Sequence, residues 1–364
     1  MKEKKKLLFT ANTLGIGGIE KALVNLLDYI DYDKYDVDLI LEKKEGEFLE
    51  RINKNVNVKE LKVSSNKIVF IRKIVNLTRK LLFKIKNKNK YDFSCCYATY
   101  SLSANKLARI ASTNSSIYIH SNYKDLYSKE EYLNFFNNRN INEFKNILFV
   151  SNEARDGFLE IYKELENKTK VFNNFIDINE IINNSKEKID LTKPKDKTLF
   201  VFIGRLDDSS KKLTRAINLV KEINDTIFWI IGDGKDRKMY EELVNKNKLN
   251  DRVIFLGMKK NPYPYLKEAD YFLLTSEYEG FPVTYLESVV LNKRIITTIN
   301  TSDESINMEK DYANIISKDE KEMVKEVRKI IKENKTPKKI DLEKIQKERI
   351  KELEKLFNGD DINA

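Results

Sequence analysis

Residues 6–30, KLLFTANTLGIGGIEKALVNLLDYI, contain a short apolar run, a glycine-rich loop and an amphipathic stretch, in that order. The apolar run at 6–10 is typical of a buried strand. From Ile19 onward, apolar residues recur at the three- and four-residue spacing of one helix face. A strand that leads through glycines into a helix predicts that the chain opens as a nucleotide-type βα unit.

The same order of apolar run and helical stretch recurs along the chain, which predicts parallel sheets built from βα units. A first series of strands is expected at 37–41, 56–61, 92–98, 117–120, 147–151 and 170–172. A second series is expected at 198–203, 227–231, 253–256, 271–275, 295–298 and 314–316. The fold class expected is α/β, with two Rossmann-like doubly wound domains facing across a cleft, where ligands of such folds bind.

A composition shift suggests where the two domains meet. The polar, charged stretch 183–197, NNSKEKIDLTKPKDK, is interpreted as an interdomain linker. We therefore expect a first domain over 1–190 and a second domain over 191–340. Residues 341–364 begin with a stretch that strongly favours a helix. We expect this helix to cap the second domain or to pack back on the first.

Composition narrows the classes of function. The chain has 364 residues, and its 67 Lys and Arg against 57 Asp and Glu leave a net charge of +10. Its apolar runs fall short of the ~20 residues that cross a bilayer, and its N-terminus lacks the apolar region of a signal peptide, so a cytoplasmic protein is expected. The only cysteines, Cys95 and Cys96, are adjacent, and His120 is the only histidine. These counts argue against a disulfide framework and a multi-His metal centre.

The block 276–287, SEYEGFPVTYLE, is the most informative for chemistry. It places Glu279 and Glu287 across a junction between a strand and a helix, and the helix N-terminus around 283–285 would offer free backbone N–H groups. Acceptor carboxylates beside an anion site suit a ligand with hydroxyls and phosphate, such as a nucleotide sugar. The alternative for this block alone is a loop with solvated glutamates.

Cations follow an earlier strand of the same half. The run 198–203 leads directly into Gly204-Arg205-Leu206, and Lys211 comes shortly afterwards. Both charges would lie just past the carboxyl end of a buried strand, where they could hold phosphate. The run 227–231 leads in the same way into Gly232-Asp233-Gly234.

Together these motifs make the second half resemble glycosyltransferases of the GT-B fold in the large retaining family 4 (glycosyl transferases group 1). The matching segments read GRL…K, IIGDG, VIFLG, ADYFLLTSEYEGFPVTYLE and IITT, and GIGGIEKALVNLL is similar to the first glycine loop and helix of that family. The resemblance covers about residues 6–40 and 198–300 well, and the middle weakly. Where the family commonly has a glycine after its lysine, this chain has Lys212.

The resemblance implies a role for each matching position. Glu279 would accept hydrogen bonds from donor-sugar hydroxyls at the reacting sugar, and Glu287 from the ribose. The other donor-binding residues implied are Gly17, Gly18, Arg205, Lys211, Gly280, Phe281, Pro282, Val283 and Thr284. Arg205 and Lys211 would hold the diphosphate, and the backbone of 281–284 would cap its oxygens.

His120 ends the apolar run 116–119, so we expect it at the carboxyl end of the first sheet, facing the cleft. Members of the resembled family carry a similar histidine close to the donor sugar, which implies a catalytic role. The alternative is a strand-end histidine that binds backbone or water. Two Asp-x-Asp patterns, at 31–33 and 36–38, are interpreted as solvated turns, and neither a metal nor another cofactor is expected.

The stretch 61–91 carries ten cations and no Asp or Glu, and apolar residues lie between them. Such a pattern predicts a basic amphipathic helix on an anionic membrane surface, at the inner face of the plasma membrane. The alternative is a core-packed helix with a solvated basic face.

We therefore expect a retaining, metal-independent transferase that moves a hexose or N-acetylhexosamine, favouring a UDP-sugar, to a hydroxyl of a glycan acceptor that is lipid-linked. Surface polysaccharide or glycoconjugate synthesis would be its setting. A nucleotide-sugar epimerase of the same fold is the first alternative. The net charge of +10 also suggests a nucleic-acid-binding protein, but no aromatic platform accompanies the basic residues, so nucleic acid is not expected as a partner.

Overall fold

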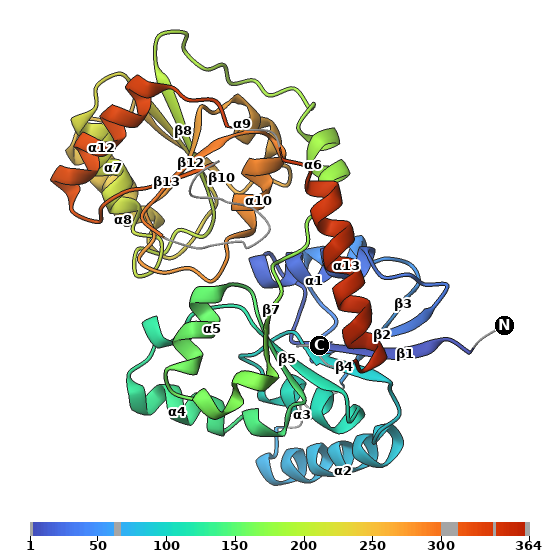
Figure 1. Cartoon of the computed structure of the whole chain (residues 1–364). Coiled ribbons are helices and arrows are strands. Elements are labelled where there is room, and N and C mark those ends of the chain that lie inside the picture. Colours follow the sequence, from blue (N-terminus) through green and yellow to red (C-terminus); the bar gives the residue numbers. More distant parts are fainter. Residues whose placement is uncertain (1–2, 62–66, 300–311, 338–339, 361–364) are drawn as a thin grey trace. The chain divides into compact units, whose positions relative to one another are not determined.

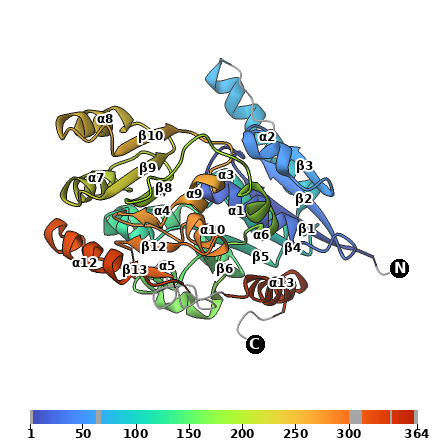
Figure 2. The ribbon, with the colours of Figure 1, turned by 90° about the horizontal axis from the view of Figure 1, so that it is seen from above.

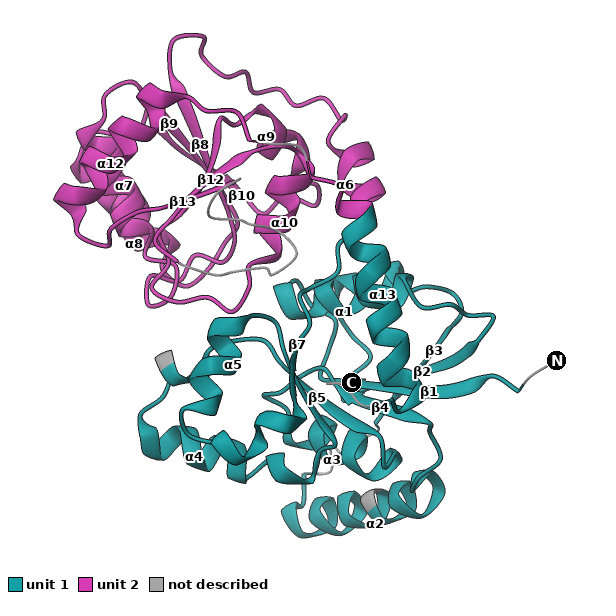
Figure 3. Cartoon of the chain, in the orientation of Figure 1, with its two compact units in different colours: residues 1–176, 344–364 teal, residues 177–343 magenta. Residues whose placement is uncertain are grey.

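The computed structural model describes residues 3–61, 67–299, 312–337 and 340–360. The chain divides into two compact units (Figure 3). The first unit comprises residues 1–176 together with 344–364, and the second comprises residues 177–343. Each unit contains one parallel sheet with helices between its strands (Figure 1).

The sheet of the first unit has seven strands in the order β3-β2-β1-β4-β5-β6-β7, all parallel. The strands are β1 Lys5–Ala11, β2 Tyr35–Leu41, β3 Val56–Glu60, β4 Phe93–Cys96, β5 Ser115–Ile119, β6 Asn146–Phe149 and β7 Thr169–Val171. The helices are α1 Gly18–Asp28, α2 Val69–Asn87, α3 Leu102–Ala111, α4 Lys129–Asn137, α5 Asn152–Leu159 and α13 Leu342–Asn358. Short 3-10 helices are η1 Glu47–Arg51, η2 Tyr123–Asp125, η3 Ile141–Glu143 and η4 Lys163–Lys168. The strand order reverses between β1 and β4, which is the switch point where such sheets bind ligands.

The sheet of the second unit has six parallel strands in the order β10-β9-β8-β11-β12-β13, and its order reverses between β8 and β11. The strands are β8 Thr198–Ile203, β9 Thr226–Ile231, β10 Val253–Gly257, β11 Tyr271–Leu274, β12 Arg294–Thr297 and β13 Ala313–Ile315. The helices are α6 Ile178–Asn184, α7 Leu213–Glu222, α8 Arg237–Lys246, α9 Tyr263–Glu268, α10 Val283–Val290 and α12 Glu320–Glu333. Every strand expected from the sequence overlaps one of β1–β13, so the α/β prediction is confirmed.

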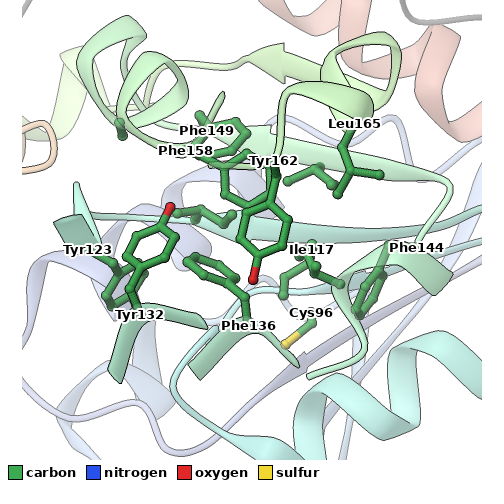
Figure 4. Packing of buried hydrophobic residues seen from close by; sticks show 14 of the residues in the cluster. Cys96, Ile117, Tyr123, Tyr132, Phe136, Phe144, Phe149, Phe158, Tyr162 and Leu165 are labelled. Carbon is green, nitrogen blue, oxygen red and sulfur yellow. The ribbon is translucent and has the colours of Figure 1, made fainter. Parts of the chain in front are cut away.

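An aromatic cluster fills one side of the first unit, beside β4, β5 and β6 (Figure 4). Phe136 and Phe158 meet edge to face with ring centroids 5.2 Å apart, and Tyr162 stacks on Phe158 at 4.8 Å. Such pairs stabilise beyond the apolar area that they bury. Cys96, a free thiol, is buried in the same cluster.

The C-terminal helix α13 packs on the first unit. The ring of Phe357 lies 5.2 Å from Tyr35 and 5.0 Å from Phe93, measured between centroids. Near the other end of the helix, Gln346 Nε2 donates to the carbonyl of Ile176 at 2.9 Å. Of the two positions expected for residues 341–364, packing on the first domain is therefore the one observed.

The stretch 183–197 does not separate the units, so its interpretation as a linker is wrong. It starts in α6, which belongs to the second unit and contacts α9 and α10. Asn261 Nδ2 donates to the carbonyl of Asn184 at 2.9 Å and to Glu187 Oε2 at 2.6 Å, which fastens the stretch to this unit. The units meet in sequence at 176 and 177, and not at the expected boundary of 190 and 191.

Candidate functional site

The carboxyl ends of β8 and β11 bring two loops together in the second unit. The strands are neighbours, so the segment after each must leave the sheet at the same edge. The backbone N–H of Glu277 donates to the carbonyl of Ser210 at 2.7 Å, and Thr275 Oγ1 donates to the carbonyl of Lys212 at 2.9 Å. These bonds hold the lysine-bearing loop against the start of the SEYEGFP block.

Lys211 and Glu279 form an ion pair between these two loops, from Nζ to Oε1. Ser276 Oγ also donates to Glu279 Oε1, at 2.7 Å. The side chains of Lys211 and Glu279 are 19% and 11% exposed, so the pair is largely shielded from water. The sequence indicated both residues as ligand-binding but gave no sign that they bind each other.

Arg205 differs from Lys211 in its surroundings. Its side chain is exposed and, within the described part of the chain, makes no hydrogen bond or ion pair. It follows β8 directly, at the same sheet edge as Lys211. Lys211 is therefore already bound to a carboxylate, whereas Arg205 is available to an anion from solution.

The loops after β8 and β9 pack too closely for side chains. Gly232 has φ +137°, and a Cβ there would meet the carbonyl oxygen of Gly204 at 1.8 Å. The backbone N–H of Leu206 donates to the carbonyl of Asp233 at 2.9 Å. Glycine at 232 is therefore required both by its backbone conformation and by the approach of the GRL loop.

Helix α10 begins at Val283, directly after Pro282. Gly280 and Phe281 are buried in front of it, and Thr284 is half-buried in its first turn. Glu287 lies one turn further along and is only 2% exposed. Tyr263 donates to Glu287 Oε1 at 3.4 Å. The structure thus places Glu287 in the interior, unlike the partly exposed Glu279.

Lys212 precedes α7 and has φ +48°. Its Nζ lies 3.9 Å from Asp208 Oδ2, so it turns toward a different carboxylate than Lys211 does. A left-handed backbone is unfavourable for a residue with a Cβ. The glycine common at this position in the resembled family would adopt the same conformation without that cost.

Gly17 and Gly18 open α1, as the sequence predicted for a glycine loop before a helix. Gly17 has an extended backbone, with φ −163°, and a Cβ there would meet Glu20 Oε2 at 2.1 Å. The other carboxylate oxygen of Glu20 accepts from the hydroxyl of Tyr100 at 3.0 Å. A Cβ at Gly18 would meet no described atom within 4 Å. A carboxylate of the protein therefore already lies against the start of this helix.

His120 follows β5 and is buried, at the carboxyl end of the first sheet as expected. Its ring stacks on Tyr118 with centroids 4.7 Å apart and lies 4.6 Å from Tyr97. Burial lowers the pKa of His120 to about 3, against a smaller raising effect of a backbone hydrogen bond with Tyr97. The imidazole is therefore neutral near pH 7.

The two Asp-x-Asp patterns are engaged with the protein. Asp31 pairs with Lys34 at 3.1 Å. Asp38 accepts from Lys59 at 2.6 Å and from the hydroxyl of Tyr91 at 2.5 Å. In the described ranges, no three His, Cys, Asp or Glu side chains gather as metal ligands.

Comparison with known proteins agrees with this architecture. The two parallel α/β sheets, each with its switch point, define a chain of the GT-B fold. Residues 183–347 match the family model for glycosyl transferases group 1, which spans most of the second unit. The structure of HepE from Anabaena, in complex with UDP and glucose, superposes with a TM-score of 0.68 at 17% identity, covering 90% of both chains.

Two curated relatives show how far the sequence similarity extends. The uncharacterized glycosyltransferase MJ1059 of Methanocaldococcus jannaschii is 32% identical over 163 residues, which are 43% of this chain and 40% of the relative. A Campylobacter jejuni protein is 25% identical over 80% of each chain, and is named an N-acetylgalactosamine-N,N'-diacetylbacillosaminyl-diphospho-undecaprenol 4-alpha-N-acetylgalactosaminyltransferase. The chain thus spans less than half of the first relative and most of the second.

Proposed function

We propose that this chain is a glycosyltransferase that moves a hexose or N-acetylhexosamine from a nucleotide diphosphate sugar to a hydroxyl of a glycan, with retention at the anomeric carbon. The observation that carries the proposal is the pairing of Lys211 with Glu279 at the switch point of the second unit. An ammonium and a carboxylate side by side are complementary to a ligand that carries phosphate oxygens and sugar hydroxyls. The group 1 family model over the same unit supports this assignment.

In the second unit, Arg205 and Lys211 bind the diphosphate, and Glu279 accepts hydrogen bonds from hydroxyls of the sugar. Negative charge grows on the departing diphosphate in the transition state, so preorganised cations stabilise it most at that stage. The backbone N–H groups at the start of α10, over 281–284, cap phosphate oxygens. Glu287 binds the ribose, and its burial fixes the carboxylate beside Tyr263.

In the first unit, Gly17 and Gly18 allow phosphate to approach the start of α1, and His120 provides a hydrogen bond to the reacting sugar. The low pKa of His120 fits a hydrogen-bonding role and argues against proton transfer by an imidazolium. We further propose that no metal or other cofactor is needed, because Arg205 and Lys211 supply the positive charge that a divalent ion would supply to a diphosphate.

The donor is proposed to be a UDP-sugar, and the acceptor a lipid-linked glycan in surface polysaccharide or glycoconjugate synthesis. The name of the Campylobacter relative, which includes a diphospho-undecaprenol, supports the lipid-linked acceptor. Incubating the full chain with UDP-, GDP- and ADP-sugars, with and without EDTA, tests the proposal. Slow release of the nucleoside diphosphate that EDTA does not abolish is expected. Formation of an epimer would favour the epimerase, and no turnover of any sugar would refute both.

We also propose that the chain has a membrane-facing surface, which is formed by helix α2. The helix contacts α3 and packs through Val75, Asn76, Phe83 and Asn87, which are only partly exposed. Figures 1 and 2 show α2 at the periphery of the first unit. Phe83 joins the apolar cluster around Leu8 and Tyr91. One side of α2 therefore packs on the rest of the first unit.

The outward side of α2 is apolar. Five residues at helical spacing form an exposed stripe, which comprises Phe70, Ile74, Leu77, Leu81 and Ile85. Four exposed cations accompany it: with 3.6 residues per turn, Lys73 and Lys84 lie along one side of the stripe, whereas Arg72 and Lys86 project from the far side of the helix. An apolar stripe on a helix that also carries exposed cations suits the interface of an anionic bilayer, and we propose that α2 lies there, at the inner face of the plasma membrane. None of the helices in the described ranges has the length and apolarity needed to span a membrane.

A further inference from the structure

Glu277 lies in the SEYEGFP block, two residues before Glu279, and has no role in the reaction proposed above. Two cations bind its carboxylate. Arg215 Nη2, in the first turn of α7, donates to Oε2 at 2.6 Å, and Lys318 Nζ, between β13 and α12, donates to Oε1 at 2.8 Å. The Glu277 carboxylate therefore joins three segments of the second unit that are far apart in the sequence.

The backbone of Glu277 is bound on both sides as well. Its N–H donates to the carbonyl of Ser210 at 2.7 Å, and its carbonyl accepts from Lys318 Nζ at 2.8 Å. Ser210 directly precedes Lys211. The backbone at Glu277 thus lies between the two members of the Lys211–Glu279 ion pair, and a shift of this backbone would move one member relative to the other.

The residues before Glu277 bind the same neighbouring loops. The carbonyl of Ser276 accepts from Thr298 Oγ1, after β12, at 2.6 Å, and the carbonyl of Thr275 accepts from Arg215 Nη1 at 3.4 Å. Ser276 Oγ in turn donates to Glu279 Oε1. The segment 275–277 is therefore held by the chain that follows β8, β12 and β13, and it contacts the Glu279 carboxylate directly.

The ion pairs of Glu277 have more to offer to geometry than to stability. The hydrogen bond from Lys318 lowers the pKa of Glu277, burial opposes this effect, and Arg215 lowers the pKa further, so the carboxylate remains charged. The side chains of Glu277 and Lys318 are 36% and 43% exposed, and ion pairs at such exposure contribute little to the stability of a fold. By contrast, moving a catalytic group by about 1 Å can lower a rate by about a hundredfold.

We propose that Glu277 is a positioning residue: held by Arg215 and Lys318, it fixes Glu279 where that carboxylate meets the hydroxyls of the transferred sugar. This inference rests on the proposed function, in which Glu279 binds the sugar. Glu277 acts through Glu279 and not on the ligand, because the two cations occupy both of its carboxylate oxygens.

The test is a double-mutant cycle of Glu277→Gln and Glu279→Gln. Glutamine keeps the shape of Glu277 but removes the charge that binds both cations. Asp270→Asn is the matched control: Asp270 lies directly before β11, at the opposite end of the strand that leads to Glu277. It likewise binds a lysine and a backbone N–H, those of Lys193 and Leu199.

Four quantities are measured for each chain. These are kcat and KM for UDP release, the Kd of UDP by calorimetric titration, and the melting temperature. The donors are UDP-glucose, UDP-galactose, UDP-N-acetylglucosamine and UDP-N-acetylgalactosamine.

Glu277→Gln should lower kcat about tenfold, and by more than it raises KM, because Glu279 is displaced from the sugar. The Kd of UDP should stay within about twofold, since UDP carries no sugar for Glu279 to bind. In the Glu279→Gln background, adding Glu277→Gln should change kcat by less than twofold, because the carboxylate that Glu277 positions is already gone. Asp270→Asn should lower the melting temperature to a similar extent but leave kcat within twofold.

Three results would overturn the inference and leave the proposed function standing. A tenfold loss of kcat that persists in the Glu279→Gln background would mean that Glu277 acts independently of Glu279. Weaker UDP binding with unchanged kcat would mean that Glu277 contacts the nucleotide. A kcat within twofold of the unmodified chain would make Glu277 a structural residue only. If the unmodified chain releases no UDP from any of the four donors, the proposed function itself fails, and the inference fails with it.

Discussion

The ammonium of Lys211 binds the carboxylate of Glu279 across the switch point of the second sheet. Each of these groups has its own ligand partner in the proposed reaction, the diphosphate for Lys211 and the sugar hydroxyls for Glu279. A bound diphosphate must therefore compete with Glu279 for the lysine. This competition predicts that removing the charge of Glu279 strengthens UDP binding, whereas removing Lys211 weakens it.

Glu279→Gln should lower turnover by at least a hundredfold while UDP binds more tightly, because the amide no longer neutralises Lys211. Removing one member of a shielded pair leaves the other charge uncompensated, so the melting temperature without ligand should fall. UDP should then stabilise this variant more than it stabilises the unmodified chain. Calorimetric titration with UDP and thermal melts measure both effects. Weaker UDP binding in Glu279→Gln would contradict the competition.

Lys211→Ala and Lys212→Ala should differ sharply in rate. Lys211 faces Glu279, whereas Lys212 Nζ turns toward Asp208, so only the former is placed for the diphosphate. Loss of Lys211 should cost several kcal/mol in the transition state, at least about a hundredfold in kcat/KM. Lys212→Ala should stay within about fivefold of the unmodified chain. The reverse order would shift the phosphate contact by one residue.

Lys212 should be replaceable by glycine with a gain in stability. Its φ of +48° is unfavourable for a residue with a Cβ, and glycine adopts this conformation freely. Lys212→Gly should raise the free energy of unfolding by up to ~1 kcal/mol in denaturant titrations, after the loss of chain entropy in glycine is included. Lys212→Ala is the control, because it keeps the Cβ. Equal stability of the two variants would show that the backbone stores no strain here.

How far the sequence could predict this structure depends on the kind of interaction. The strands were predictable because each is an apolar run that a parallel sheet buries on both faces, as in 198–203 and 226–231. The stretch 183–197 was misread because it is polar itself, whereas the buried Ile181 that anchors α6 lies just before it. Composition reports average polarity, and one buried side chain is enough to attach a short helix.

The sequence could predict which residues form the candidate site, but not which of them bind each other. Glu279 and Lys211 could be singled out because each lies beside a strand end, where ligands of parallel sheets bind. Their ion pair depends on the order of β8 and β11 in the sheet, which is a long-range property.

His120 should contribute a characteristic pH dependence to stability. The unfolded chain takes up a proton on this residue near pH 6.5, but the folded chain does so only near 3. Its contribution is therefore complete above about pH 6.5 and is lost as the pH falls toward 3, at up to about 1.4 kcal/mol per pH unit. His120→Asn keeps a donor for the Tyr97 backbone but does not titrate, so its stability should fall less steeply over this range. Parallel curves from denaturant titrations at several pH values would contradict the assignment.

The same variant separates stability from turnover. His120→Asn lacks the acceptor at Nε2, so kcat should fall at least tenfold while the Kd of the donor changes little. Because the imidazole is neutral throughout the working range, the unmodified chain should show no loss of kcat near pH 6.5 that His120→Asn removes. A pH limb at 6.5 that disappears in His120→Asn would assign proton transfer to this residue instead.

Helix α2 should bind anionic vesicles through both its cations and its apolar stripe. Each cation near an anionic surface contributes about 1 kcal/mol, so replacing Arg72, Lys73, Lys84 and Lys86 with Gln should weaken binding by up to about a thousandfold. The control is replacement of four exposed lysines of α12 with Gln, which changes the net charge equally and should leave binding nearly intact; these are Lys321, Lys325, Lys329 and Lys332. Sedimentation with vesicles of phosphatidylglycerol and phosphatidylcholine measures the binding of both variants.

Raised salt should release the unmodified chain only in part, because the apolar stripe of α2 still binds the membrane when the charges are screened. A second variant, with Phe70 and Leu77 replaced by Ser, should bind weakly even at low salt. If the α2 and α12 variants lose binding equally, net charge and not this helix holds the chain on the membrane.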